Sequence, residues 1–156
     1  MPEATIAAIR RLLLCILLIG LAGMATELLL LRHDEELTQL IPLILIAFAL
    51  LAILWHAVDQ GPASLLTVQV TMVLFIIAGM LGVYLHYQAN VQFQREVDPS
   101  IAGRALLWKA LTAKTPPALA PGSMLQLGLI GLAYAYRYPT RVRDHEKPLA
   151  PGTGAA

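Results

Sequence analysis

The chain has 156 residues, of which 58% are hydrophobic and 13% are charged, and its formal net charge is +1. Soluble domains are typically about 45–50% apolar and about 25% charged, so this composition excludes a water-soluble globule as well as an intrinsically disordered chain. The near-neutral charge also disfavours nucleic acid as a partner, because nucleic-acid-binding domains carry a basic patch. We therefore expect an integral membrane protein in contact with the lipid bilayer.

Four apolar stretches are long enough to cross a bilayer, which takes roughly 20 mostly apolar residues. They cover residues of about 12–31, 40–57, 65–87 and 118–136. Because backbone groups in lipid must form their hydrogen bonds internally, all four stretches are predicted to be helices. The sequence thus predicts an all-α fold, a four-helix membrane bundle within residues 1–138.

The first stretch has a competing interpretation as a secretory signal peptide. The pair Arg10 and Arg11 precedes an apolar run, and Gly23 and Ala25 have the small-x-small spacing of a cleavage site. The run continues to Leu31, which makes it long enough for a membrane span. We therefore favour a retained helix.

The connections between the stretches predict how the helices are arranged. A short acidic connection, residues 32–36, makes the first two helices antiparallel neighbours, and Ser64 is a candidate N-cap of the third helix. The third connection, residues 88–117, is too long for a simple turn. Within it, Asp98 is the expected N-cap of a short amphipathic helix over residues 99–113.

Trp108 lies on the apolar face of this short helix and is a candidate interfacial anchor. The alternative is a helix packed over the mouth of the bundle. Residues 139–156 are rich in Pro, Gly and Ala after a basic start, and we expect a flexible tail there.

The distribution of basic residues predicts the orientation in the membrane. Four spans place both termini on one side, with six basic residues there against five on the other. The terminal side has Arg10, Arg11, Arg137, Arg141, Arg143 and Lys147, and the other side has Arg32, Arg95, Arg104, Lys109 and Lys114. Since Arg10, Arg11 and Arg137 adjoin the spans directly, we expect both termini to be cytoplasmic, in a bacterial inner membrane.

Glu27 is an acidic residue inside the first span. A carboxylate in a membrane helix is costly and is by default a functional-site hypothesis. It shares a helical face with Gly20 and Gly23, a kind of face that other helices approach closely, so we expect it to point into the bundle. A proton, cation or ligand site is one interpretation, and a carboxylic acid satisfied near the interface is the other.

A polar stripe follows the third helix and includes Gln69, His86 and Asn90. Together with Glu27, this stripe is the candidate intramembrane polar site. His33 and His86 belong to the same outer side, with Glu35, and are weak candidates for metal or haem ligands. The chain has no HxxxH, ExxH or CxxC spacing, and the single cysteine, Cys15, excludes an internal disulfide. We expect no cofactor.

His56 lies on the side opposite to these residues, so it cannot join them. With Trp55 beside it, His56 is interpreted as an interfacial residue.

Small residues recur at the spacing of packed membrane helices. The candidates for close helix packing are Gly20, Gly23, Ala78, Gly82, Gly128, Gly131 and Ala135. In the fourth stretch, Gln126 lies on the face opposite to the glycines. Two distinct faces predict two sets of partners, one within the chain and one in a neighbouring protein. The alternative is that Gly and Ala are simply common in membrane helices.

Residues 81–90 and 118–129 resemble segments of small four-span bacterial membrane proteins that have no assigned activity. The resemblance implies a four-span bundle and transfers no functional residues. No phosphate-binding loop, nucleophile elbow or carboxylate pair is present, so we expect no enzyme.

The function we expect is that of a non-catalytic accessory or scaffold subunit of a larger membrane complex, with energy-transducing complexes among the candidates. One alternative is a small transporter or ligand-binding protein that uses Glu27 and the polar stripe. A second is a metal- or haem-binding membrane protein.

Overall fold

A computed structural model describes residues 3–31, 37–113 and 118–140. These residues form five helices and no strand, so the expected all-α class is confirmed for them. The helices are α1 (Glu3–Leu30), α2 (Leu37–Asp59), α3 (Pro62–Val97), α4 (Gly103–Leu111) and α5 (Gly122–Ala135). The flexible tail expected over residues 139–156 lies outside the described residues from position 141 onward.

Three helices, α1, α2 and α3, are long and apolar enough to cross a membrane. The fourth predicted span, 118–136, contains the shorter helix α5. Its 14 residues extend about 21 Å, less than the roughly 30 Å of a hydrocarbon core. The structure therefore supports a helical membrane protein with three helices of spanning length. Helix α5 is apolar but shorter than these three.

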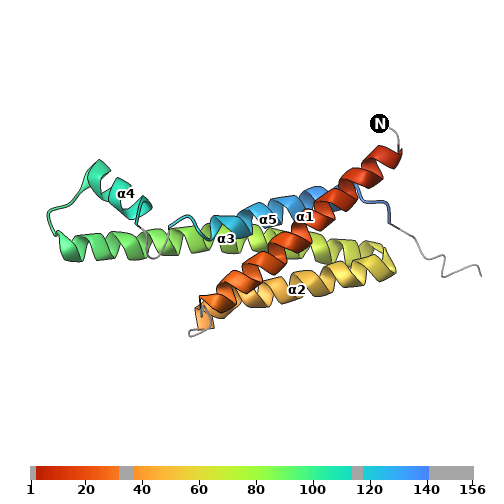
Figure 1. Cartoon of the computed structure of the whole chain (residues 1–156), viewed down its shortest axis with the longest axis horizontal. Coiled ribbons are helices and arrows are strands. Elements are labelled where there is room, and N and C mark those ends of the chain that lie inside the picture. Colours follow the sequence, from red (N-terminus) through yellow and green to blue (C-terminus); the bar gives the residue numbers. More distant parts are fainter. Residues whose placement is uncertain (1–2, 32–36, 114–117, 141–156) are drawn as a thin grey trace, which may run out of the picture.

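Helices α2, α3 and α5 run along one long axis in alternating directions (Figure 1). Helix α3 packs most extensively against α5, and α2 packs against α3. Helix α1 crosses the group obliquely and contacts α5 more than α2. The beginning of α1, the turn between α2 and α3 and the end of α5 all lie at one end of the molecule, which we call the terminal end.

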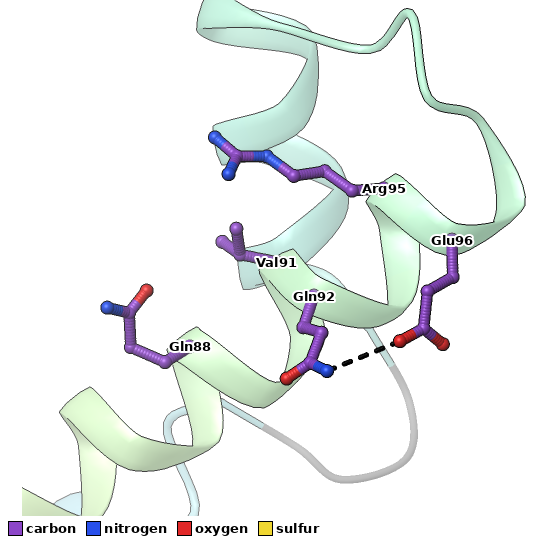
Figure 2. A pocket seen from close by; sticks show the side chains of 5 residues that line it. All are labelled: Gln88, Val91, Gln92, Arg95 and Glu96. Atoms are coloured by element: carbon purple, nitrogen blue, oxygen red, sulfur yellow. Dashed lines mark hydrogen bonds between the residues drawn. The ribbon is translucent and has the colours of Figure 1, made fainter.

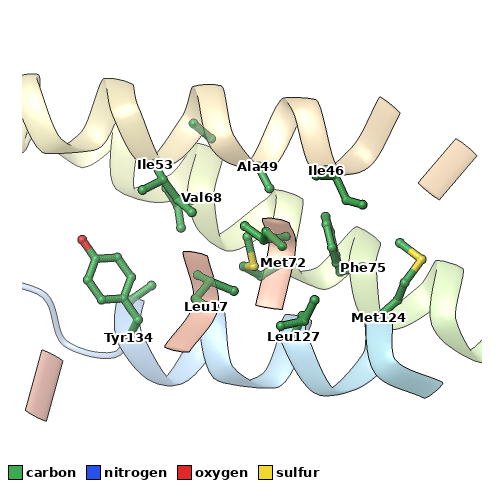
Figure 3. Packing of buried hydrophobic residues seen from close by; sticks show 13 residues of the cluster. Leu17, Ile46, Ala49, Ile53, Val68, Met72, Phe75, Met124, Leu127 and Tyr134 are labelled. Atoms are coloured by element: carbon green, nitrogen blue, oxygen red, sulfur yellow. The ribbon is translucent and has the colours of Figure 1, made fainter. Parts of the chain in front are cut away.

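The core lies between α2, α3 and α5, with α1 covering one side. Met72 and Phe75 of α3 occupy its centre and are fully buried (Figure 3). Helix α1 adds Leu17 and Leu21. Since lipid is as apolar as these side chains, close van der Waals packing rather than exclusion from water holds such helices together.

Glycines allow α3 and α5 to approach each other closely. A Cβ on Gly128 of α5 would lie 2.7 Å from the carbonyl oxygen of Met72, and one on Gly79 of α3 would lie 2.6 Å from the backbone nitrogen of Leu125. Backbone therefore faces backbone at both positions, and no side chain fits between the two helices there.

Helix α3 continues well beyond its predicted apolar stretch, 65–87. Its 36 residues extend about 54 Å, so its last turns project past the end of a bilayer-spanning segment. The helix ends at Val97, with Asp98 in an extended conformation as its C-cap. Pro99 explains this end, because a proline disfavours the helical conformation in the residue before it.

Two expected helix caps are therefore wrong. Asp98 ends α3 instead of starting the next helix, and α4 begins later, with Ala102 as its N-cap. At the other end of α3 the N-cap is Gly61, followed by Pro62, and the Ser64 hydroxyl donates back to the carbonyl of Gly61 at 3.0 Å. Pro62 has no N–H and a fixed φ, which suits the first helical position.

Helix α4 packs onto the projecting end of α3. Leu106 and Ala110 of α4 and Ile101 before it form a small buried cluster with Val91, and Tyr87 packs against it. Trp108 is on the outer side of α4, where 69% of its surface is exposed. Helix α4 thus contacts the extension of α3. The role of Trp108 as an interfacial anchor stays a prediction.

Candidate functional site

A buried polar cluster lies at the terminal end of the bundle and centres on His56. The imidazole is fully buried, and its Nδ1 lies 3.0 Å from the hydroxyl oxygen of Ser64, which is also fully buried. The turn between α2 and α3 brings the two residues together. Asp59 stabilises that turn by accepting a hydrogen bond from the Gly61 N–H at 3.0 Å.

The hydrogen bonds of Ser64 favour one tautomer of the neutral imidazole ring. Ser64 has one hydroxyl proton, and it is donated to the carbonyl of Gly61. In the contact with His56, therefore, the Ser64 oxygen accepts and Nδ1–H donates. In the neutral ring this makes Nε2 a bare acceptor, and that atom is buried with no hydrogen-bond partner among the described residues.

Aromatic side chains from the end of α5 close the cluster. The rings of His56 and Tyr138 meet edge to face, with their centroids 4.6 Å apart, and the Tyr134 ring is 6.5 Å from His56. The Arg10 guanidinium lies 5.1 Å from the centre of the Tyr138 ring, within the range of a cation–π contact.

Arg10 also ties the beginning of α1 to the end of α5. Its Nη2 donates to the backbone carbonyl of Arg137 at 2.7 Å and to that of Tyr136 at 3.3 Å. These carbonyls follow the last turn of α5, where backbone acceptors lack helical partners. Arg137 itself has a positive φ of 47°. The cluster thus joins residues of all three long helices to α5.

His56 does not face the outside of the bundle as an interfacial anchor would, since its side chain is fully buried. Sequence reasoning correctly kept it apart from the outer residues but missed the cluster. One signal was available: His56 and Ser64 flank the Gly61–Pro62 turn, and a turn of that length brings its flanking polar side chains close together.

Glu27 lies elsewhere, on the wall of an open groove between α1 and α5. The groove has a volume of about 450 Å³, and Glu27, Ser123 and Gln126 supply its polar groups. Its apolar lining consists of Ile16, Ile19, Gly20, Met24, Leu127 and Ile130. Glu27 is exposed and does not point into the bundle as expected. The helical angle places it on the flank of α1, beside the buried side formed by Leu17 and Leu21.

The polar residues of α3 are distributed over different contacts. Gln69 donates to the Ala135 carbonyl at the end of α5 at 3.4 Å, whereas buried Asn90 donates to the Ala110 carbonyl of α4 at 3.1 Å. Gln69 and Asn90 are about 31 Å apart along the helix axis. His86 is half-buried between them. The structure does not bring these residues together with Glu27 into one site.

The small residues selected from the sequence take part in different contacts. Gly20 faces Leu127, Gly82 faces Pro121, and both Gly128 and Gly131 face Met72. Ala135 is one of the buried core residues. Ala78 is partly buried and packs against the same core. Gly23 is exposed and has no heavy atom within 4 Å of where a Cβ would lie.

Within the described ranges, no three His, Cys, Asp or Glu side chains are close enough together to hold a metal ion. His33 and Glu35, which the sequence grouped with His86, lie outside the described residues.

A second hollow, of about 410 Å³, lies on the projecting end of α3. Gln88, Val91, Gln92, Arg95 and Glu96 line it, and Gln92 donates to the Glu96 carboxylate at 3.3 Å (Figure 2). All five residues come from one helix face, so this hollow is an open surface beside α4.

No protein-family model, curated protein or solved structure matches the chain. A functional proposal therefore rests on the contacts and exposed faces of the described helices.

Proposed function

We propose that the protein is a non-catalytic accessory subunit of a larger membrane assembly, which it joins through the outer face of α1. The observation that carries this proposal is how little of α1 is covered. In the most apolar 18-residue segment of α1, 11% of the residues are buried. The corresponding segments of α2 and α3 each have 28% of their residues buried. A helix of this length that is held on one narrow side leaves most of its surface available to a neighbour.

The outer face of α1 consists of Cys15, Leu18, Ala22, Thr26 and Leu29. These residues recur every three or four positions and are all exposed. The Thr26 hydroxyl donates to the Ala22 carbonyl within the helix at 2.8 Å, so its polarity is satisfied without a partner. Ala22 and Thr26 form a small-xxx-small pair, which allows the backbone of a second membrane helix to come close.

In this proposal the chain crosses a bacterial inner membrane four times, with both termini in the cytoplasm. Two features support it: α1 begins and α5 ends at the same end of the molecule, and Arg10 lies at that end. Basic residues next to spans favour the cytoplasmic side. Reporter fusions at residue 2 and after residue 140 test the orientation, and a periplasmic signal from either would contradict it.

Cys15 provides a direct test of the docking face, because it is exposed and is the single cysteine of the chain. A photoactivatable cross-linker attached there in native membranes should form one adduct of defined mass with another membrane protein. The same protein should co-purify in mild detergent, in a fixed ratio.

Ala22→Phe should abolish both the adduct and co-purification, because the larger side chain fills the small-residue pair. The control is Leu81→Phe on α3, also at an exposed position. The proposal is wrong if mild detergent yields isolated monomer alone, or if Ala22→Phe and Leu81→Phe behave alike.

A further inference from the structure

The groove between α1 and α5 becomes less polar from one end to the other. Glu27 is one turn from the end of α1, and Ser123 and Gln126 are in the first turns of the antiparallel helix α5. Ile16, Ile19 and Ile130 lie further along the groove. Gly20, packed against Leu127, marks the crossing of the two helices. The polar groups thus lie near the end of α1 and the beginning of α5, and the apolar lining leads toward the middle of α1.

We propose that this groove binds one phospholipid with a primary ammonium head group, taken from the surrounding leaflet. The proposal is independent of the docking face described above, because that face is on the other flank of α1. It commits the groove to a lipid whose head group carries N–H donors rather than to a protein helix.

The length of the groove fits one acyl chain. Between Ile16 and Glu27, the α1 axis rises about 16 Å, close to half of the roughly 30 Å hydrocarbon core. The volume of about 450 Å³ is in the range of about 300–1,000 Å³ that ligand sites typically have. A chain lying along Ile16, Ile19 and Ile130 therefore spans its own leaflet.

The charge of the lining selects the head group. Glu27 is the one charged residue that lines the groove in the described part of the chain. A carboxylate near the hydrocarbon is costly unless it is paired. The Ser123 hydroxyl proton is donated to the Ala120 carbonyl at 2.8 Å, which leaves its oxygen as an acceptor. The Glu27 carboxylate and the Ser123 oxygen therefore supply acceptors at this end, and an ammonium group, with three N–H donors, complements them.

Native mass spectrometry of the full chain, with three lipids of identical acyl chains, tests the proposal. Phosphatidylethanolamine should bind at one site about tenfold more tightly than phosphatidylcholine, which has the same net charge but no N–H donor. Phosphatidylglycerol, which has no cation, should bind no better than phosphatidylcholine. Equal retention of the three lipids would overturn the proposal.

Glu27→Gln should remove the preference for phosphatidylethanolamine while retaining the helical content and thermal transition of the parent protein. Glu96→Gln is the matched control, because Glu96 is an exposed carboxylate on the projecting end of α3. If Glu27→Gln keeps the preference, or Glu96→Gln loses it equally, the proposal is wrong.

A photoreactive residue at Met24 identifies the occupant in native membranes, since Met24 lines the groove. An adduct with the mass of a phosphatidylethanolamine supports the proposal. An adduct with another protein, or with a second copy of this chain, would show that the groove is a helix-docking surface and would overturn it.

Discussion

The Nδ1 of His56 and the hydroxyl oxygen of Ser64 are 3.0 Å apart, and both side chains are fully buried across the turn that joins α2 to α3. Because Ser64 also donates to Gly61, this contact favours the tautomer in which Nδ1 of His56 carries the proton. The imidazole of this pair also meets the Tyr138 ring edge to face, which connects the turn to the residues after α5.

Ser64→Ala should destabilise the protein by about 1–3 kcal/mol, because it leaves the buried Nδ1–H of His56 without an acceptor. The change in unfolding free energy is measured in detergent micelles by denaturant titration. Thr67→Ala is the control: its hydroxyl bonds locally to the Ala63 carbonyl at the surface of the helix. Equal effects of the two substitutions would contradict the assignment of the Ser64 bond as the important one.

Arg10→Gln should loosen the beginning of α1 from the end of α5. The variant loses the hydrogen bonds to Tyr136 and Arg137 and the contact over Tyr138. Hydrogen bonds to a charged group are worth about 1.5–3 kcal/mol, so amide exchange in the last turn of α5 should accelerate by at least about tenfold. Arg11→Gln, at an exposed position, should leave that exchange unchanged.

Hydropathy predicted the long helices well but misplaced the end of α3. It marks where a chain leaves the membrane, whereas a helix ends where its backbone conformation changes. Residues 88–97 are more polar than the apolar stretch before them but contain no proline or glycine, so nothing breaks α3 before Pro99. The first part of the long connection expected over residues 88–117 is therefore an extension of α3, and α4 folds onto it.

The His56 cluster could not be predicted from periodicity within one helix. Its burial depends on Tyr134 and Tyr138, which lie about 80 residues further along the chain, and on the packing of α5 against α3. Glu27 illustrates the opposite case. It shares a helical face with Gly20 and Gly23, which was expected to be buried in the bundle, but Gly20 packs against α5 while Gly23 remains open, so that face is a groove wall.

Gly128→Ala and Gly23→Ala make a matched pair for the close approach of helices. A Cβ at position 128 would meet the backbone oxygen of Met72 at 2.7 Å, so Gly128→Ala should cost about 1–3 kcal/mol through overpacking. Gly23→Ala meets no atom and should be neutral or stabilising by up to about 1 kcal/mol, from helix propensity. Thermal unfolding in micelles ranks the two, and the reverse order would contradict the packing of α3 against α5.

Asn90→Leu should release α4 from the extension of α3. The Asn90 amide is buried and donates to the Ala110 carbonyl at 3.1 Å. Leucine has nearly the same size but leaves that carbonyl without this donor, a loss of about 1–3 kcal/mol. Limited proteolysis should then cut within residues 98–121 faster than in the parent. Gln92→Leu is the control, because Gln92 is exposed on α3. If Gln92→Leu also accelerates cleavage within residues 98–121, Asn90 has no specific role in holding α4.

The turn between α3 and α4 should loosen in acid. The Ser100 hydroxyl and N–H both donate to the Asp98 carboxylate, at 2.6 and 3.1 Å, and they hold the pKa of Asp98 below its ordinary value of 3.8. A depressed folded-state pKa contributes stability that is fully present above the unfolded value and is lost as the pH falls through the folded one. Ser100→Ala should therefore raise the pKa of Asp98 toward 3.8, as measured by NMR titration of its carboxyl carbon. An unchanged titration curve would show that other groups, such as Lys109, set the ionisation of Asp98.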